Sequence, residues 1–403
     1  MVPAVKSDKM LWWLRAVYLL TGLMFWYGIE QLFLDKYLHN PSARGYVTIA
    51  FTATLVLFDI PGGVLADRIG RKFCLIWSAL AQIAGLVILG TSDSLPIYIV
   101  GTVVFGLFWC LFDGAAQALL YDWLAERKET KRYAKLQGSM YAVWLTGAGI
   151  ANLASGFIGH FWGLRSAYLL SAIPGTIALF CIFKLREAPH ERKTETPWYT
   201  HAIDALREAR SHKKIFGFAL QFMAANVILL TIGEFGQIYL LSFGVSTIVL
   251  GLLWAATAGF AAAGRGLAHR LQLKPRLAIG IFCMVLAAFA LVHSAVGIGI
   301  FWLVYGLNEA VSNIAETEIQ DATSSHIRAT MLSMVNFAGN TLAIPVVLLF
   351  TAYYRQNGIM AADQFVALAA VVVLLATLLI KPAKHVKPAP DIAPEPPKVQ
   401  EVI

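Results

Sequence analysis

Four of the acidic residues inside long apolar stretches of the chain stand out: Glu30, Asp113, Glu234 and Glu309. Inside a membrane an acid either carries a proton or pairs with a substrate, or it is a structural group held by a hydrogen-bond donor, and a functional role is the default. Glu309 lies nearest the middle of its stretch, so we expect it to carry a coupling proton, with Asp113 as the second candidate. Glu30 and Glu234 occupy matching ends of their stretches. For these two acids, a role in gating and simple solvation by water are equally good interpretations.

Aromatic and polar side chains accompany these acids at helical spacing. Tyr305 and Asn313 lie one turn either side of Glu309, and Trp109 and Gln117 flank Asp113 in the same way. Large rings suit an amphipathic or aromatic solute. We therefore expect a substrate cavity lined by Glu30 and Glu234 together with Trp26, Trp109, Gln117, Asn226, Trp302, Tyr305 and Asn313. For the amide of Asn226, an interhelical hydrogen bond is the leading alternative.

The motifs of several enzyme classes are missing from the sequence. It contains no G-x-x-x-x-G-K-[ST] phosphate loop, no G-x-S-x-G and no H-E-x-x-H. Its four cysteines are far apart within apolar stretches, which fits neither a disulfide framework nor a zinc site. We expect no catalytic residues, no metal site and no cofactor.

The composition is that of a membrane protein. The 403 residues are 58% hydrophobic and 14% charged, and the mean hydropathy is +0.65, whereas soluble domains carry about 25% charged residues. Each spanning helix takes ~20 residues. The sequence predicts twelve of them, at 11–34, 45–66, 73–91, 96–121, 137–159, 165–184, 214–242, 246–268, 276–296, 299–320, 331–353 and 363–381.

Basic residues are distributed unevenly around these spans. With the amino terminus inside, the 32 Lys and Arg residues fall on the cytoplasmic side except for Lys36, Arg44, Arg165 and Arg355. This bias predicts that both termini are cytoplasmic. It also accounts for the net charge of +8 without nucleic acid as a partner.

Two hydrophilic segments divide the chain. Residues 186–213 separate six spans from six, and we interpret them as a cytoplasmic linker with an amphipathic helix. The proline-rich tail, 383–403, has little to bury and is expected to be disordered. The predicted domains are therefore two six-helix bundles, 1–185 and 214–382.

The gap after the second span holds the most specific motif. It reads Gly63-Val-Leu-Ala-Asp67-Arg68-Ile-Gly70-Arg71-Lys72, which resembles the G-x-x-x-D-R-x-G-R-K signature of the major facilitator superfamily of secondary transporters. The glycines allow tight turns and close helix approach. A degraded second copy, Leu267-Ala-His269-Arg270-Leu271, lies 202 residues after Leu65, as expected for repeated halves.

The resemblance implies an all-α fold in which two six-helix bundles, related by a pseudo-two-fold axis, rock about a central site. Spans 1, 4, 7 and 10 would line the cavity, and the four central acids fall in these spans. Spans 3, 6, 9 and 12 would face lipid; we expect no charge in the apolar parts of 3, 6 and 12, and only His293 in span 9.

The resemblance also implies a gate at the loop motif. There Asp122, at the cytoplasmic end of span 4, would pair with Arg71; solvation of Asp122 is equally open. Small residues in spans 5 and 8, Gly147-x-x-x-Ala151 and Gly251-x-x-x-Ala255, predict close packing of these spans between the bundles.

We interpret the chain as a monomeric inner-membrane transporter that moves a small organic solute by alternating access, coupled to protons. Gly147-Ala-Gly149 in span 5 favours export, although the proline typical of antiporters is missing there. Proton-coupled uptake is the first alternative. A nontransporting sensor on the same scaffold, with the linker and tail as partner sites, is the alternative of another class.

Overall fold

The computed structural model describes residues 8–187, 213–271, 274–292, 294–323 and 328–378. Within these ranges the regular elements are helices, and no strand occurs among them. The predicted linker is described only at its two ends. The predicted tail lies outside the described residues.

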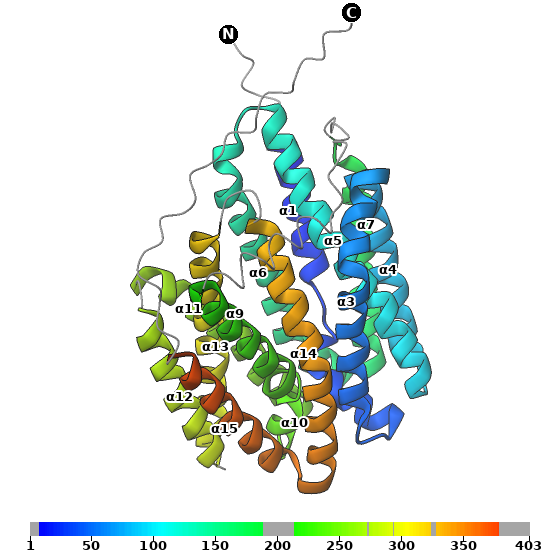
Figure 1. Ribbon diagram of the computed structural model, residues 1–403. Coiled ribbons are helices and arrows are strands. Elements are labelled where there is room, and N and C mark those ends of the chain that lie inside the picture. Colours follow the sequence, from blue (N-terminus) through cyan, green and yellow to red (C-terminus); the bar gives the residue numbers. More distant parts are fainter. Residues whose placement is uncertain (1–7, 188–212, 272–273, 293, 324–327, 379–403) are drawn as a thin grey trace, which may run out of the picture.

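The first half of the chain forms one bundle, coloured blue to teal in Figure 1. The first span consists of α1 (Asp8–Gly22), the 3-10 turn η1 (Tyr27–Ile29), α2 (Glu30–Phe33) and the π-helical turn η2 (Leu34–Leu38). The others are α3 (Ala43–Ile69), α4 (Arg71–Thr91), α5 (Leu95–Glu126), α6 (Tyr133–Phe161) and α7 (Leu164–Lys184), with a short turn, η3 (Thr130–Arg132), before α6.

The second half repeats this arrangement. Its first span consists of α9 (Lys213–Ile228), the π-helical turn η4 (Leu229–Gly233) and α10 (Gly236–Leu241). It continues with α11 (Thr247–Leu271), α12 (Pro275–Leu291), α13 (Val296–Ala322), α14 (Arg328–Asn357) and α15 (Ile359–Leu378). Ten helical segments of the described residues are long and apolar enough to cross a membrane, and α3 and the 17-residue α12 complete the predicted twelve.

The first and seventh spans are the interrupted ones. The first breaks after Gly22, where the chain passes so close to α6 that a Cβ atom would lie 2.5 Å from the Trp144 carbonyl oxygen. The seventh changes to π-helical geometry at Leu229–Gly233. Irregular turns of this kind occur mostly at functional sites, and both lie in spans that the sequence assigns to the cavity.

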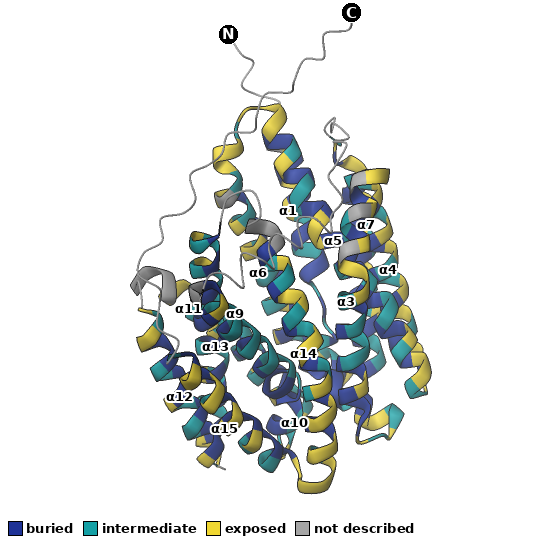
Figure 2. Cartoon of the chain, in the orientation of Figure 1, coloured by how far each residue is buried: buried dark blue, intermediate teal, exposed yellow. Residues whose placement is uncertain are grey.

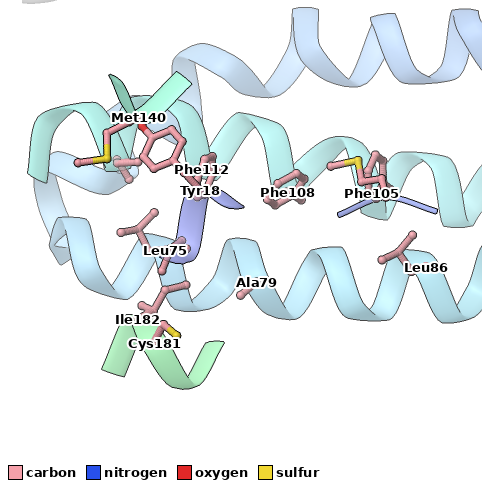
Figure 3. Close-up of a cluster of buried hydrophobic side chains, with 14 of the residues drawn as sticks. Tyr18, Leu75, Ala79, Leu86, Phe105, Phe108, Phe112, Met140, Cys181 and Ile182 are labelled. Atoms are coloured by element: carbon pink, nitrogen blue, oxygen red, sulfur yellow. The ribbon is translucent and has the colours of Figure 1, made fainter. Parts of the chain in front are cut away.

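Each bundle has its own apolar core. In the first, rings and aliphatic chains from α1, α4, α5 and α7 interdigitate, with Phe105, Phe108 and Phe112 stacked along α5 (Figure 3). A separate cluster in the second bundle centres on Phe235, Phe282 and Phe301. The fully buried residues of each core come from one half of the chain, and Tyr27, Leu32 and Ile49 of the first half pack against the second core.

We name the two ends of the bundles by their residues. The motif end contains the junction of α3 and α4 at Ile69–Arg71, and the far end contains α2 and the start of α3 at Ala43. The bundles meet through α6 against α11 and through α3 against α14. At the far end Gly45 approaches Thr351 so closely that a methyl group on Gly45 would strike the Thr351 side chain.

The outward faces of α4, α7, α12 and α15 carry exposed large apolar side chains, as expected for helices that face lipid (Figure 2). Examples are Trp77 at 50%, Phe180 at 64% and Met284 at 65% exposed. One expectation for these helices is wrong. Asp363, the first residue of the predicted span 363–381, lies one turn inside α15 and is 3% exposed. His293, predicted in span 9, lies outside the described residues beyond the end of α12.

Candidate functional site

A cavity of about 490 Å³ lies between the two bundles. It is lined by residues from both halves of the chain, and the four predicted acids are among them. The lining includes eight aromatic side chains: Trp26, Tyr27, Phe51, Phe105, Trp109, Trp144, Trp254 and Tyr305. Of the residues predicted for a substrate cavity, five line this one: Trp26, Glu30, Trp109, Glu234 and Tyr305.

Four predicted cavity residues do not line this cavity: Gln117, Asn226, Trp302 and Asn313. The Asn226 amide donates a hydrogen bond to Asn340 of α14 (3.1 Å), which is the interhelical role that the sequence left open. The Trp302 indole donates to the Leu253 carbonyl of α11 (3.1 Å). Gln117 acts on the site indirectly, because its amide donates to Asp113 (2.7 Å).

The cavity closes at the far end against a buried charge cluster. Arg44 of α3 donates to Glu30 (Nη1 to Oε2, 2.6 Å), and these side chains are only 2% and 5% exposed. The same nitrogen lies 3.7 Å from Oε2 of Glu234, in the other bundle. Arg44 Nε also donates to Gln31 (3.2 Å). One guanidinium therefore serves two carboxylates, one from each bundle.

Within the first bundle, the Glu30–Arg44 pair is supported by two tyrosines. The Tyr98 hydroxyl donates to Oε1 of Glu30 (2.7 Å) and lies 2.9 Å from the Tyr168 hydroxyl. Each carboxylate oxygen of Glu30 thus has a donor, as a buried charge requires. This pair needs nothing from the second bundle.

Glu234, in contrast, depends on the first bundle. The Tyr27 hydroxyl donates to its Oε1 (3.1 Å), and Arg44 faces its Oε2. Gln237, one turn later, donates to the Tyr27 carbonyl (2.6 Å) and accepts from the Gln31 backbone N–H (2.9 Å). These contacts cross between the bundles, so they must break if the far end opens.

Asp113 and Asp59 face the middle of the cavity from α5 and α3. Asp113 is exposed to it, accepts a hydrogen bond from Gln117, and belongs to no ion pair among the described residues. Two rings lie beside it, because Trp109 is one turn away on α5 and packs edge-to-face on Trp144 of α6 (5.4 Å between centroids). This region can take a proton or a positively charged group.

Glu309 projects from the middle of α13. Its Oε2 lies 3.9 Å from Arg265 of α11, and Arg265 also pairs with Glu316 (3.1 Å). Glu316 lies on the motif-end side of Glu309 along α13. All three residues belong to the second bundle, and the Arg265 guanidinium also lies over the Tyr141 ring of α6 in the first bundle (5.9 Å to the ring centroid).

The loop motif, Gly63 to Lys72, has the geometry that its sequence predicts. Gly70 has a φ of +106°, a conformation that favours glycine, and separates α3 from α4. Arg71 donates to Asp122 at the end of α5 (3.3 Å), and the side chains are 16% and 22% exposed. The Lys72 ammonium donates to the Phe183 carbonyl of α7 (2.8 Å). The motif thus fastens α4 to α5 and α7 within one bundle.

The remaining motif residues are less informative. Gly63 has open space around it, whereas its neighbour Gly62 approaches the Cys110 carbonyl oxygen of α5 at a distance that only glycine tolerates. Arg68 is exposed. Asp67 lies in α3, but its side chain is outside the described part of the structure. The same holds for the side chains of the degraded copy, His269 and Arg270.

Sequence reasoning missed the roles of Arg44, Gln31 and Arg265. Arg44 was counted as a loop residue on the outer face, although the helix that begins at Ala43 includes it. The sequence did contain a signal for the role of Arg44. This residue lies four positions before Thr48 on an apolar helix face, where a basic side chain must pair with an acid.

The family model that matches the sequence is the Major Facilitator Superfamily, over residues 11–347. Among solved structures, the nucleoside transporter NupG superposes with a TM-score of 0.73 at 16% identity, covering 92% of this chain and 98% of that one. The D-xylose-proton symporter gives a TM-score of 0.70 at 16% identity, covering 92% and 97%. At these identities the similarity shows the fold.

Curated relatives match over shorter stretches. The multidrug resistance protein MdtG of Klebsiella pneumoniae (strain 342) is 27% identical over 45% of this chain and 44% of its own length. The inner membrane transport protein YajR of Escherichia coli (strain K12) is 32% identical over 31% and 26%. The chain matches less than half the length of these relatives. The family model, however, spans most of the chain, and the chain is a member of the Major Facilitator Superfamily.

Proposed function

We propose that this protein is a monomeric secondary transporter of the inner membrane that moves a small amphipathic or aromatic organic solute by alternating access. The observation that carries this proposal is a ring-lined cavity between two self-contained bundles, closed at one end by contacts that cross between them. Separating the bundles at the far end would open the cavity there without breaking either core.

The motif end is proposed to face the cytoplasm, with both termini on that side. The distribution of Lys and Arg supports this orientation. The closed far end would then be the outer side. Cysteine labelling at exposed positions checks the orientation: in intact cells a membrane-impermeant maleimide should modify His39→Cys and spare Arg127→Cys.

The solute class rests on the cavity lining. Rings supply apolar contact area, and five carboxylates line the cavity against the guanidinium of Arg44 (Glu30, Asp59, Asp113, Glu234 and Glu309). A strongly anionic solute would meet repulsion there. The relatives are named for multidrug resistance, glucose transport and uridine/deoxyuridine transport, so their names do not select one class.

Proton coupling is proposed to pass through Glu309, with Asp113 as the second candidate. A carboxylate that alternates between wet and dry surroundings takes up a proton in one state and releases it in the other. Glu309→Gln, which imitates the protonated acid, should keep solute exchange in proteoliposomes while losing accumulation driven by a pH gradient. If Glu309→Gln still accumulates solute and Asp113→Asn does not, the role belongs to Asp113.

Export is favoured over uptake by the glycine-rich stretch in α6, and everted vesicles test it. Energised everted vesicles should accumulate an exported solute, whereas right-side-out vesicles should accumulate one that is taken up. A solute that binds to the purified protein but does not exchange across proteoliposomes would support the sensor alternative and contradict transport.

A further inference from the structure

Asp363 is a buried acid that the transport cycle described above does not use. It lies one turn into α15, at the far end of the second bundle, and is 3% exposed. Among the described residues, neither carboxylate oxygen has a hydrogen-bond partner and the side chain belongs to no ion pair. It does not line the cavity between the bundles.

A second orphaned oxygen lies near it. The hydroxyl of Tyr239, on α10, is buried without a hydrogen-bond partner in the described part of the chain, and the side chain is 1% exposed. Tyr239 and Asp363 lie on α10 and α15, two helices that contact each other. A methyl group on Gly297 would collide with the same hydroxyl and would lie 2.9 Å from the Val292 carbonyl oxygen. The Tyr239 hydroxyl and the Val292 carbonyl oxygen therefore both lie beside Gly297, and α15, which carries Asp363, contacts both α10 and α12.

The surroundings of these oxygens are apolar. Tyr239 packs against the rings of Phe243, Phe289 and Phe301. An ionised carboxylate without donors or a counter-charge is very costly in such surroundings. A hydrogen bond alone does not supply the missing positive charge. Carbonyl groups at a helix carboxyl end, such as that of Val292 after α12, favour a cation.

No described basic side chain supplies this charge. α9 and α12 carry their charged residues, Lys213, Lys214 and Arg276, at the motif end, and η4 contains none. On α14, Tyr353, Tyr354 and Arg355 lie near the far end; Tyr354 packs against Phe235, and Arg355 is exposed. On α10, which contacts α15, Tyr239 is the titratable residue.

We propose that Asp363, the Tyr239 hydroxyl and the Val292 carbonyl bind one small cation, Na⁺ or a proton, that ties α10 to α15. Either Na⁺ or a proton would supply one positive charge to the Asp363 carboxylate. The position of this cation site links it to the contacts that close the cavity between the bundles. Gln237 and Glu234, which make the cross-bundle contacts, lie within five residues of Tyr239 on the segment that the cation would hold.

Thermal unfolding of the purified full-length protein, followed by tryptophan fluorescence, tests the proposal. The probes are NaCl against choline chloride at equal ionic strength at pH 8, and pH 5.5 against pH 8 in choline. We expect Na⁺, acid or both to raise Tm by roughly 2–5 °C in the parent protein. If both act, their effects should not add, because they compete for one carboxylate. A Na⁺ response at pH 8 identifies the ion as Na⁺, and a response to acid alone identifies a proton.

Three variants make this assay specific. Asp363→Asn should abolish the response, whereas Asp93→Asn, which removes an exposed far-end carboxylate paired with Arg165, should keep it. Tyr239→Phe retains the carboxylate and should require several-fold more cation for the same shift, so it serves if Asp363→Asn fails to fold. His293→Gln should keep the response.

Three results would overturn the site. In the first, the parent protein melts at the same temperature in all conditions. In the second, Asp363→Asn or Tyr239→Phe responds as the parent does. In the third, His293→Gln loses the response, because an imidazolium would then supply the charge. None of these results bears on solute flux, so the transport proposal stands or falls separately.

Discussion

The two ends of the molecule hold their charges differently. At the far end Arg44 is buried and faces carboxylates from both bundles, Glu30 and Glu234. At the motif end the pairs Arg71–Asp122 and Arg265–Glu316 are partly exposed, and each lies within one bundle. A rigid-body movement of the bundles changes the first arrangement and leaves the second intact. The far-end cluster is therefore the part whose energy depends on conformation.

The largest expected effect is at the centre of this cluster. Arg44→Met would leave the buried Glu30 beside the partly exposed Glu234 without a cation, and should cost about 3–5 kcal/mol in the free energy of unfolding. Denaturant unfolding followed by tryptophan fluorescence measures the loss. The double variant Glu30→Met/Arg44→Met should regain part of it. If Arg44→Met is as stable as the parent, the cluster does not hold the far end.

Gly45→Ala tests the steric contact beside the cluster. Its methyl group would strike the Thr351 side chain across the bundle interface, so the far end should be forced apart or lose about 1–3 kcal/mol. Spin labels at exposed His39 and Asn357 report the separation, because the four native cysteines are buried. Thr351→Ala should restore part of the short distance. An unchanged distance in Gly45→Ala would show that the contact is not tight.

Glu234→Gln tests charge alone. The amide oxygen can still accept from Tyr27, but the attraction to Arg44 is lost, which is worth about 1 kcal/mol at this partly exposed position. The ratio of open to closed far end should rise about fivefold, as measured with the same label pair. Glu316→Gln makes the same change within one bundle and should leave that ratio unchanged. Equal effects of the two variants would remove the distinction between the ends.

The smallest effect on stability is expected at the motif. Arg71→Ala removes a partly exposed pair within one bundle and should change the free energy of unfolding by less than about 1 kcal/mol. Arg71→Ala and Asp67→Asn should nevertheless slow turnover more than they weaken solute binding. Arg186→Ala, which removes an exposed pair with Glu126, is the control. Turnover equal to the parent's at matched expression would contradict a gating role.

The spans and the placement of the acids were predictable because hydrocarbon imposes length and excludes charge. Glu30, Asp113, Glu234 and Glu309 stand out for this reason, and all four line the cavity. The Arg71–Asp122 pair was predictable because Arg71 belongs to a motif with a defined sequence signature.

Other features depend on which side chains pack against each other in the folded protein. The periodicity of the sequence does not contain this information. Trp302 and Asn226 have the same polar character as the true lining residues, yet their partners, Leu253 and Asn340, lie away from the cavity. Arg44 was assigned to a loop because helix boundaries are uncertain by a few residues. Asp363 was overlooked because it is the first residue of its predicted span and was not counted in the apolar part.

The glycine contact between α6 and α11 has a mechanical consequence. The pairing of these helices was predicted, and Gly251 packs against the backbone of Gly156 near the far end. About 8 Å of α6 lies beyond Gly156 on that side, against about 35 Å toward the motif end. Rotation about this contact is therefore an unequal lever: a movement of about one ångström at the far end displaces the motif end by about four.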